Sequence, residues 1–211
     1  MLSTSEEILI ADLFCNGDFP AVPGLFDLIN GIHIDEIWQT IQSHRENLLA
    51  PAPNNIPQFS NTDEIDRVLN VVANVDCPLN FQVIGSYLRP SAEKAGAQRK
   101  YGENHYKLAS SLGLTTLPVY GLSVLGEEYY HATDPSIEKQ VLKKLVLRIP
   151  IVQQALFMAM DGHCCLKDLM EQCLSESTAV RRKSNIFTLM RWVEDISDTT
   201  MLHLLNRITW E

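Results

Sequence analysis

The first third of the sequence has almost no positive charge. Residues 1–66 contain eleven Asp or Glu and a single basic residue, Arg45, whereas residues 67–211 contain sixteen Lys or Arg against fifteen Asp or Glu. The formal net charge of −9 therefore comes from the N-terminal segment. An acidic average argues against a nucleic-acid partner, but a local basic face is the better guide to one. The uneven charge predicts two parts with different roles.

Long apolar runs and a basic N-terminal segment are also missing. No run of eighteen apolar residues occurs, so no membrane span is expected. The first seven residues contain no Lys or Arg, and we therefore expect no secretory signal. Five cysteines, an odd number, then indicate free thiols in a reducing compartment. These features predict a cytoplasmic protein without a membrane partner.

Most catalytic motifs are absent. The sequence has no G-x-G, which excludes the dinucleotide fingerprint, and no H-E-x-x-H. It also has no Asp-x-Lys or Glu-x-Lys triplet, which metal-dependent restriction nucleases use to hold Mg²⁺ and activate water. We therefore expect a non-enzymatic protein with no catalytic residue and no cofactor.

One cysteine cluster invites a metal. His163, Cys164 and Cys165 are adjacent and Cys173 follows, but zinc needs ligands that converge from separated pairs. Cys165 and Cys173 fall on one helical face with apolar neighbours, which favours a packed core. We expect no metal site, and we expect His105, on the apolar face of its segment, to be a core histidine.

The prolines divide the chain. Helical patterns cover residues 3–15, where Ser3 and Glu6 have capping-box spacing, and residues 32–49. Pro51, Pro53 and Pro57 then interrupt all periodicity. Residues 1–57 are thus predicted to be an acidic helical extension with a Pro-rich linker. Residues 58–132 follow with a helix, a short helix, a longer polar helix over 91–112 and a hairpin over 114–121. This order is typical of a winged helix-turn-helix.

The same order of elements returns in residues 133–211. A helix is expected over 134–149, with Asp134 as its N-cap and Pro135 at its first position. Further helices are expected over 150–160 and 166–174, and a long basic helix over 175–197. The predicted fold is mainly α, with tandem winged helix-turn-helix modules, small β-wings and the acidic extension in front.

The long helix 175–197 has two unlike faces. Its apolar residues are spaced for burial, and they are Val180, Ile186, Leu189, Met190, Val193 and Ile196. The opposite face presents Arg, Asn and Thr, which pair with guanine, adenine and phosphate in a duplex groove. A solvated surface helix is the alternative. The predicted DNA contacts on the two long helices are Arg181, Arg182, Lys183, Asn185, Thr188, Arg99, Lys100, Asn104 and Lys107.

Four local patterns extend this interpretation. The most specific is Ser175-x-Ser-Thr-x-x-Arg-Arg-x-Ser-x-Ile-x-x-Leu-x-x-Trp192. Asn104-His-Tyr-Lys-Leu-Ala-Ser-Ser-Leu-Gly-Leu114, Leu122-Ser-Val-Leu-Gly126 and Leu145-Val-Leu-Arg-Ile-Pro-Ile151 accompany it. Together they resemble the tandem winged-helix modules of type II restriction enzymes over residues 62–198. In the first module Lys100-Tyr101 stands where the family has an Arg-Gln pair, and no nuclease domain accompanies the modules.

The resemblance implies a recognition or regulatory subunit of a restriction or phage-defence system. Such a subunit would bind double-stranded DNA beside a nuclease or ATPase subunit, and the resemblance is compatible with an oligomer. A second interpretation belongs to another class. Tandem winged helices in an acidic chain also resemble the kleisin-binding subunits of bacterial chromosome-condensing complexes. In that case the chain is a protein–protein adaptor. Residues 1–57 would then be a docking surface, or a mask over the basic helices.

Overall fold

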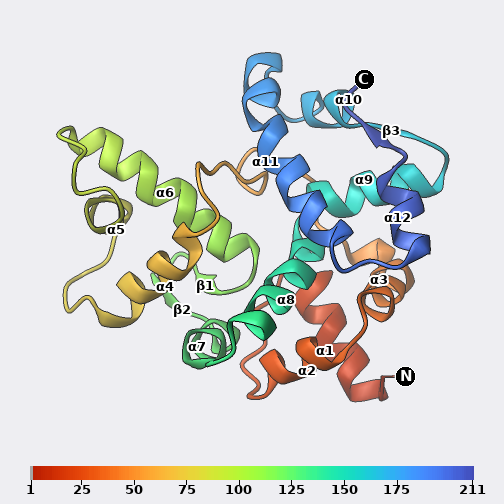
Figure 1. The fold of residues 1–211 in the computed structure, drawn as a ribbon, viewed down its shortest axis with the longest axis horizontal. Coiled ribbons are helices and arrows are strands. Elements are labelled where there is room, and N and C mark those ends of the chain that lie inside the picture. The colour runs from red at the N-terminus through yellow and green to blue at the C-terminus, as the bar shows by residue number, and fades with distance from the viewer. Residues whose placement is uncertain (1) are drawn as a thin grey trace.

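The acidic N-terminal third forms three short helices in a computed structural model that describes residues 2–211 (Figure 1). They are α1 (Thr4–Phe14), α2 (Leu25–Gly31) and α3 (Ile34–Ser43), followed by the 3-10 turn η1 (Arg45–Asn47). Ser3 and Glu6 form a capping box at the start of α1, because the serine hydroxyl accepts from the Glu6 N–H and the Glu6 carboxylate accepts from the Ser3 N–H. The predicted helix start is thereby confirmed.

Residues 58–132 form a unit of four helices and a hairpin. Its elements are α4 (Glu64–Asn74), α5 (Phe81–Leu88), α6 (Ala95–Ser111), β1 (Thr115–Thr116), β2 (Gly121–Leu122) and α7 (Val124–His131). The two strands are antiparallel, with Thr115 opposite Leu122. The hairpin that the sequence predicts over 114–121 is therefore present. The unit has a small core of its own, composed of Val68, Val71, Ile84, Leu88, Tyr106 and Ala109.

Two glycines bring α5 and α6 into backbone contact. A Cβ atom on Gly85 would lie 1.8 Å from the Gln98 carbonyl oxygen, and one on Gly102 would lie 2.1 Å from that of Phe81. Neither distance is tolerable for a real Cβ atom, so only glycine fits at this crossing. The crossing fixes how α6 is presented by the unit.

The remaining elements form the largest part of the molecule. They are α8 (Pro135–Leu145), the 3-10 turn η2 (Val146–Arg148), α9 (Pro150–Met160), β3 (Cys164–Cys165), α10 (Leu166–Glu171), α11 (Glu176–Glu194), α12 (Thr199–Leu205) and β4 (Ile208–Thr209). Asp134 caps α8 and Pro135 occupies its first turn, as predicted. Within residues 2–211, no helix is both long and apolar enough to cross a lipid bilayer.

The second predicted β-wing is not formed. After α11 the chain enters helix α12 and then β4, which pairs in parallel with β3 rather than folding back as a hairpin. Met201 and Leu204 of α12 are buried, so the apolar tail stabilises a helix against α9 instead of two exposed wing strands. A mainly helical fold is confirmed, and tandem symmetry of two winged modules is not.

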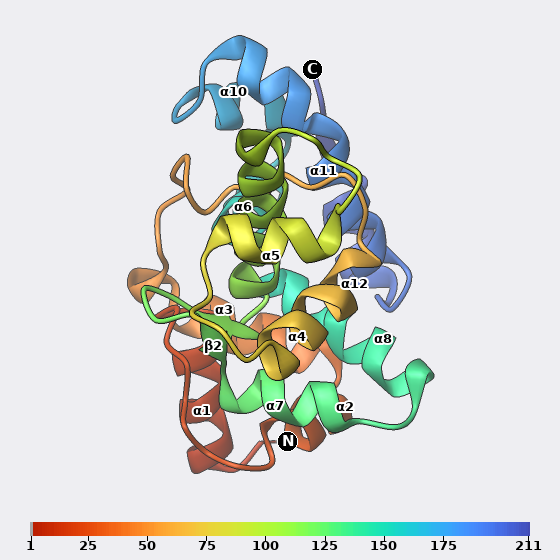
Figure 2. The same cartoon turned by 90° about the vertical axis from the view of Figure 1, so that its left-hand side faces the viewer.

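The N-terminal third is part of the main core and not an extension in front of it. Buried residues of α1, α2 and α3 lie in one continuous apolar cluster with α8, α9 and α11. Figure 2 shows α1 and α2 beside α7 and α8 at the same end of the molecule. The acidic side chains mark the outside of these helices, and their Ile, Leu and Phe residues make the segment integral to the fold.

Two buried cations attach this segment to the centre. Lys144 of α8 donates to the carbonyls of Ile29, Asn30 and Ile32 at 2.7–2.9 Å. Arg148 of η2 donates to five carbonyl oxygens, which belong to Leu13, Gly17, Asp18, Ser110 and Ser111. Most of these carbonyls close the C-terminal ends of α1, α2 and α6, where the helix dipole favours a cation.

Candidate nucleic-acid interface

The polar front of α11 faces a segment of the same chain. Arg182 donates through Nη1 to the carbonyls of Pro53 and Ile56, at 2.8 and 2.7 Å. Asn185 donates through Nδ2 to the carbonyl of Phe59 at 2.7 Å. We name residues 53–59 the strap; Figure 1 shows it, in orange, passing between α6 and α11. The front of α11 predicted to face a duplex is covered here by the strap.

The opposite side of the strap faces α6. Lys100, Asn104 and Lys107 line a cavity of about 80 Å³ that they share with the strap and with Arg182. Glu103 lies between the two lysines, 3.1 Å from Lys100 Nζ and 2.7 Å from Lys107 Nζ. The hydrogen bond from Lys107, followed by that from Lys100, lowers the pKa of Glu103. The two helix fronts therefore face each other across the strap in a narrow crevice.

The remaining predicted contacts lie elsewhere. Arg99 and Arg181 are exposed; the Arg181 guanidinium donates within α11, to the Ser177 carbonyl and the Thr178 hydroxyl. Lys183 Nζ lies 4.8 Å from the ring centre of Trp210, a cation–π contact. Thr188 is half-buried. The structure thus sets five of the nine residues around the strap and does not gather all nine on one outward surface.

The apolar face of α11 agrees with its sequence pattern except at one position. Ile186, Leu189, Met190 and Val193 are buried, and Ile196 is half-buried, whereas Val180 is 53% exposed. Val180 lies in the first turns of α11, where the neighbouring Ala179 is the residue buried in the main core. Asn185 is buried instead, at 8% exposure, because its amide reaches the strap.

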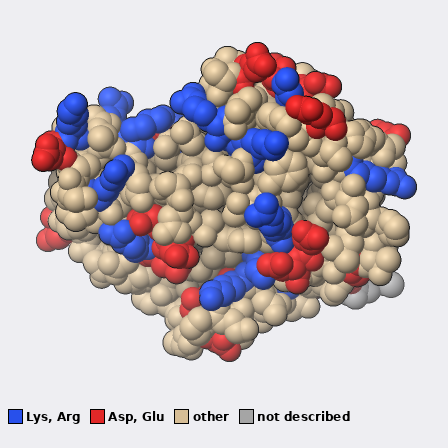
Figure 3. Space-filling view, turned by 45° about the horizontal axis from the view of Figure 1, so that its top comes forward, with Lys and Arg blue, Asp and Glu red and all other residues tan. Residues whose placement is uncertain are grey.

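Exposed positive charge gathers around α5 and α6. Residues 81–122 contain five Lys or Arg against two Glu, a net charge of +3. Figure 3 shows Lys and Arg side chains over the upper left of the molecule, where Figure 1 places α5 and α6. The N-terminal half of α6, with Lys94 just before it, is exposed at Arg99 and Lys100. This face is open to a large anionic partner, whereas the crevice is not.

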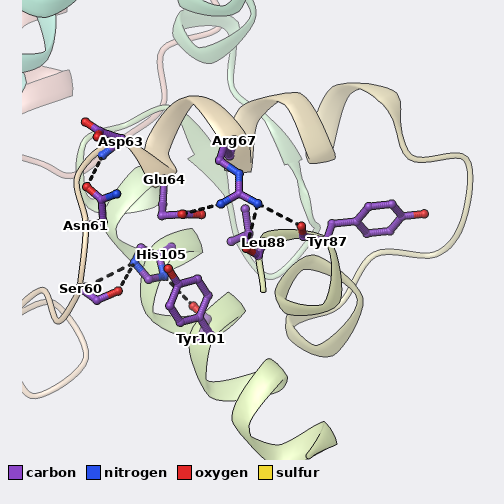
Figure 4. Close-up of polar contacts among 9 residues, drawn as sticks. All are labelled: Ser60, Asn61, Asp63, Glu64, Arg67, Tyr87, Leu88, Tyr101 and His105. Atoms are coloured by element: carbon purple, nitrogen blue, oxygen red, sulfur yellow. Dashed lines mark hydrogen bonds and ion pairs between the residues drawn. The ribbon is translucent and has the colours of Figure 1, made fainter. Parts of the chain in front are cut away.

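A buried polar cluster fixes the strap to the helical unit. Figure 4 shows His105 of α6 pointing toward Ser60, whose N–H and hydroxyl both lie 3.3 Å from His105 Nε2. The other ring nitrogen, Nδ1, lies 2.9 Å from the Tyr101 carbonyl. Nδ1 therefore carries the proton, and Nε2 accepts from Ser60. His105 is a buried structural histidine, as the sequence predicts, and burial lowers its pKa.

The same cluster joins α4 to α5. Arg67 forms an ion pair with Glu64 at 2.6 Å and donates to the carbonyls of Tyr87 and Leu88 at the end of α5 (Figure 4). Glu64 is buried, and its second carboxylate oxygen has no hydrogen-bond partner among the described residues. The pair orients α5 relative to α4, and hence the angle at which α6 leaves the unit.

The cysteine cluster forms a packed edge. Cys164 is buried in β3, and burial raises its pKa to about 11. Cys165 Sγ donates to the Trp210 carbonyl, and His163 Nε2 lies 2.8 Å from the Thr209 hydroxyl. Among residues 2–211, no group of three or more His, Cys, Asp or Glu side chains is arranged to hold a metal ion.

The strap is the part of this candidate site that sequence patterns miss. Its contacts use main-chain carbonyls, which every residue has, so no motif identifies Pro53, Ile56 or Phe59 as partners of α11. One signal is present: residues 48–62 contain no charged residue, although the chain around them is rich in charge. Comparisons of this chain with known protein families, with curated proteins and with solved structures found no match.

Proposed function

We propose that this chain is a non-enzymatic DNA-binding protein that contacts the duplex through the exposed cationic half of α6. The observation that carries the proposal is the three-helix unit α4–α6 with its hairpin. The unit presents a long helix at the surface, within a stretch (residues 81–122) whose net charge is +3, in a chain that is acidic overall. Duplex phosphates attract such a face, and a helix is the element that fits the major groove.

The contacts assigned on this face are Lys94, Arg99 and Lys100. Arg99 and Lys100 are one residue apart and exposed, so phosphate oxygens reach both. Lys100 gives up only a solvent-exposed pair with Glu103 when it binds phosphate, and such pairs contribute about 0–1 kcal/mol. Arg181, exposed at the start of α11, supplies a second contact at the edge of the duplex.

The proposal includes a division of labour. The chain acts as a recognition or regulatory subunit of a restriction or phage-defence system, and a separate nuclease or ATPase subunit carries out the chemistry. Support for this role is the pattern of residues 175–192 together with the absence of catalytic motifs in the sequence.

A binding titration at two salt concentrations tests the DNA proposal. Fluorescence anisotropy of a short random duplex is expected to show binding that weakens steeply with salt. Replacing Lys94, Arg99 and Lys100 together by Ala should reduce the affinity and lower the salt slope by about 0.9 for each phosphate that the variant no longer neutralises. Replacing the exposed residues Lys139 and Arg191 by Ala is the matched control, since they lie on α8 and at the far end of α11.

Two results contradict the proposal. One is the absence of any duplex binding by the native chain, and the other is an unchanged salt slope in the triple variant. A stable complex with a protein partner, without a DNA shift, would instead favour the adaptor interpretation.

A further inference from the structure

The strap is held in the crevice as a bound peptide is held. Three of its main-chain carbonyls accept hydrogen bonds from two side chains of α11, Arg182 and Asn185. One of its side chains, Ile56, is 3% exposed and lies in the apolar cluster beneath. Main-chain hydrogen bonds with a pocket for one anchoring side chain are how many proteins bind extended segments of other proteins.

The composition of the strap suits this mode of binding. The fifteen residues 48–62 are uncharged, and they connect η1 to α4 without a helix or strand. Pro51, Pro53 and Pro57 restrict the segment, which lowers the entropy lost on binding. Asn55 shapes it from within, because its side chain accepts from the Ala52 N–H at 2.6 Å and donates to the Ala50 carbonyl. Uninterrupted loops of this length are uncommon in a compact fold unless they have a function.

The crevice is not filled by the strap. A cavity of about 80 Å³ lies on its α6 side, lined by Asn54, Gln58 and residues of α6. A second cavity, of about 370 Å³, adjoins the end of α6 at Lys107 and Ser111, where Asn54 and Asn55 of the strap face Phe19 and Leu117. Arg182 Nε is buried, and among the described residues it has no acceptor. Burial lowers the pKa of Arg182, so its charge is only partly compensated by the strap. The groove has more donors and more room than its occupant uses.

From these contacts we propose that the crevice between α6 and α11 binds an extended segment of a partner protein, and that the strap is its internal occupant. The partner segment is uncharged, contains an aliphatic residue followed by proline, and offers a free carbonyl three residues before that aliphatic residue. Those are the features that Pro53, Ile56 and Pro57 present now. The inference does not depend on DNA binding: of the three assigned DNA contacts only Lys100 also lines the crevice, and Lys94 and Arg99 take no part in it.

A synthetic peptide tests the groove. The peptide has the sequence of residues 50–60 and carries a fluorophore, and the protein is the full chain with Ile56→Ser, which removes the anchor of the strap. A tethered strap competes at an effective concentration in the millimolar range, so the peptide should bind the variant at least about tenfold more tightly than the native chain. Arg182→Ala added to this variant should abolish binding, whereas Arg181→Ala, one position away and exposed, should leave it unchanged.

The outcomes separate the possible occupants. No binding of the peptide to a folded Ile56→Ser chain overturns the proposal, as does equal binding of a peptide whose Ile is replaced by Asp. Dimerisation of the variant without peptide would show a second copy's strap in the crevice and also contradict a partner segment. A gain of duplex affinity in the variant without peptide binding would show that the strap covers a DNA face instead.

A second measurement covers the case in which Ile56→Ser does not fold. In the native chain the amides of Asn55 and Ile56 bond to the Ala52 carbonyl, which slows their hydrogen exchange. A millimolar concentration of the unlabelled peptide should displace the strap and speed the exchange of both amides. Unchanged exchange at that concentration overturns the proposal.

Discussion

At the scale of single residues, Arg148 determines more of this structure than any surface charge. Its guanidinium is buried without a carboxylate partner, yet all its donor nitrogens reach carbonyl oxygens at 2.8–3.3 Å. Burial lowers its pKa to about 10, although the charge of Asp18 opposes the shift, and Arg148 therefore stays charged at neutral pH. Arginine can make this many bonds because its planar fork carries five donor hydrogens.

Arg148→Met is expected to destabilise the protein by about 3–5 kcal/mol. Methionine fills a similar space, but it takes this donor away from five carbonyls at the centre of the fold. Urea unfolding at constant m-value measures the loss. Arg191→Met, at an exposed position of α11, is the matched control and should change stability by less than about 0.5 kcal/mol. Equal stability of the two variants would contradict this role for Arg148.

At the scale of elements, the crossing of α5 and α6 depends on the absence of side chains. Gly102 lies in the middle of α6, where glycine lowers helix stability, and it is buried against the start of α5. Gly96 lies in the same helix, yet a Cβ atom there would meet nothing within 4 Å. Substitution of Gly96 therefore tests helix propensity alone, whereas substitution of Gly102 also tests packing against α5.

Gly102→Ala should destabilise the protein by about 1–3 kcal/mol or more, because the added methyl group forces α5 and α6 apart. Gly96→Ala should stabilise it by up to about 1 kcal/mol, since alanine is the better helix former and has room. Thermal unfolding of both variants measures the difference in sign. A stabilising effect of Gly102→Ala would show that the crossing tolerates a side chain.

A second contact between elements is sensitive to pH. Asp35 lies in the first turn of α3, and its carboxyl group hydrogen-bonds to that of Asp198, which caps α12. Burial and the neighbouring Asp198 raise the pKa of Asp35 to about 6, while His33 opposes the shift. A pKa above the unfolded value means that the stabilising contribution is present at low pH and is lost as pH rises through about 6.

Asp35→Asn should therefore raise the melting temperature at about pH 8, and the gain should shrink towards pH 4. The amide donates to the Asp198 carboxylate at every pH, whereas the native carboxyl group does so only when protonated. Melting curves across this range measure the effect. Asp27→Asn, at an exposed position in the first turn of α2, is the matched control. A gain in melting temperature that does not change with pH would contradict a hydrogen bond between Asp35 and Asp198 that depends on protonation of Asp35.

At the scale of the whole molecule, the acidic third and the C-terminal helices fold as one core. Ile10, Leu13, Phe14 and Ile37 belong to the same buried cluster as residues of α8, α9 and α11. Removing the N-terminal segment would expose that surface and leave Lys144 and Arg148 without most of their acceptors.

A chain that lacks residues 1–57 is accordingly expected to lose cooperative thermal unfolding or to aggregate. Apolar surface of this extent is not tolerated in water. Circular dichroism melting and gel filtration measure the outcome. The Asp27→Asn variant of the full chain is the control, because it changes an exposed acidic residue of the same segment and keeps the core. A truncated chain that stays monomeric and melts cooperatively would show that the segment is a separable extension.

Local patterns accounted for most of the elements. Capping residues at Ser3 and Asp134 and the apolar stripe over 186–193 predicted helices where the structure has them. Turn residues predicted the hairpin β1–β2. The second wing was not confirmed: in the described part of the chain α11 is followed by α12 and β4, which pairs in parallel with β3, and the apolar tail packs against α9.

The predicted site shows the same limit. The sequence identified the charged fronts of α6 and α11 but not what lies between them. The sequence does not distinguish an Arg side chain that is free to bind phosphate from one that donates to a main-chain carbonyl. Every residue has such a carbonyl, so residue identity does not reveal which carbonyl accepts. DNA binding by these residues remains a prediction, with Arg99 and Arg181 exposed and Arg182 and Asn185 engaged by the strap.

By itself the sequence determined the helical class, the starts of α1 and α8 and the uneven charge, because periodicity and capping act within a few residues. Tertiary structure alone decided that the acidic third belongs to the core and that Pro53, Ile56 and Phe59 cover α11. It decided them through contacts between residues more than a hundred positions apart, such as Arg182 with Pro53 and Lys144 with Ile29. Those contacts are hydrogen bonds to main-chain carbonyls and the packing of apolar side chains from distant segments in one core. A local sequence pattern predicts neither of them.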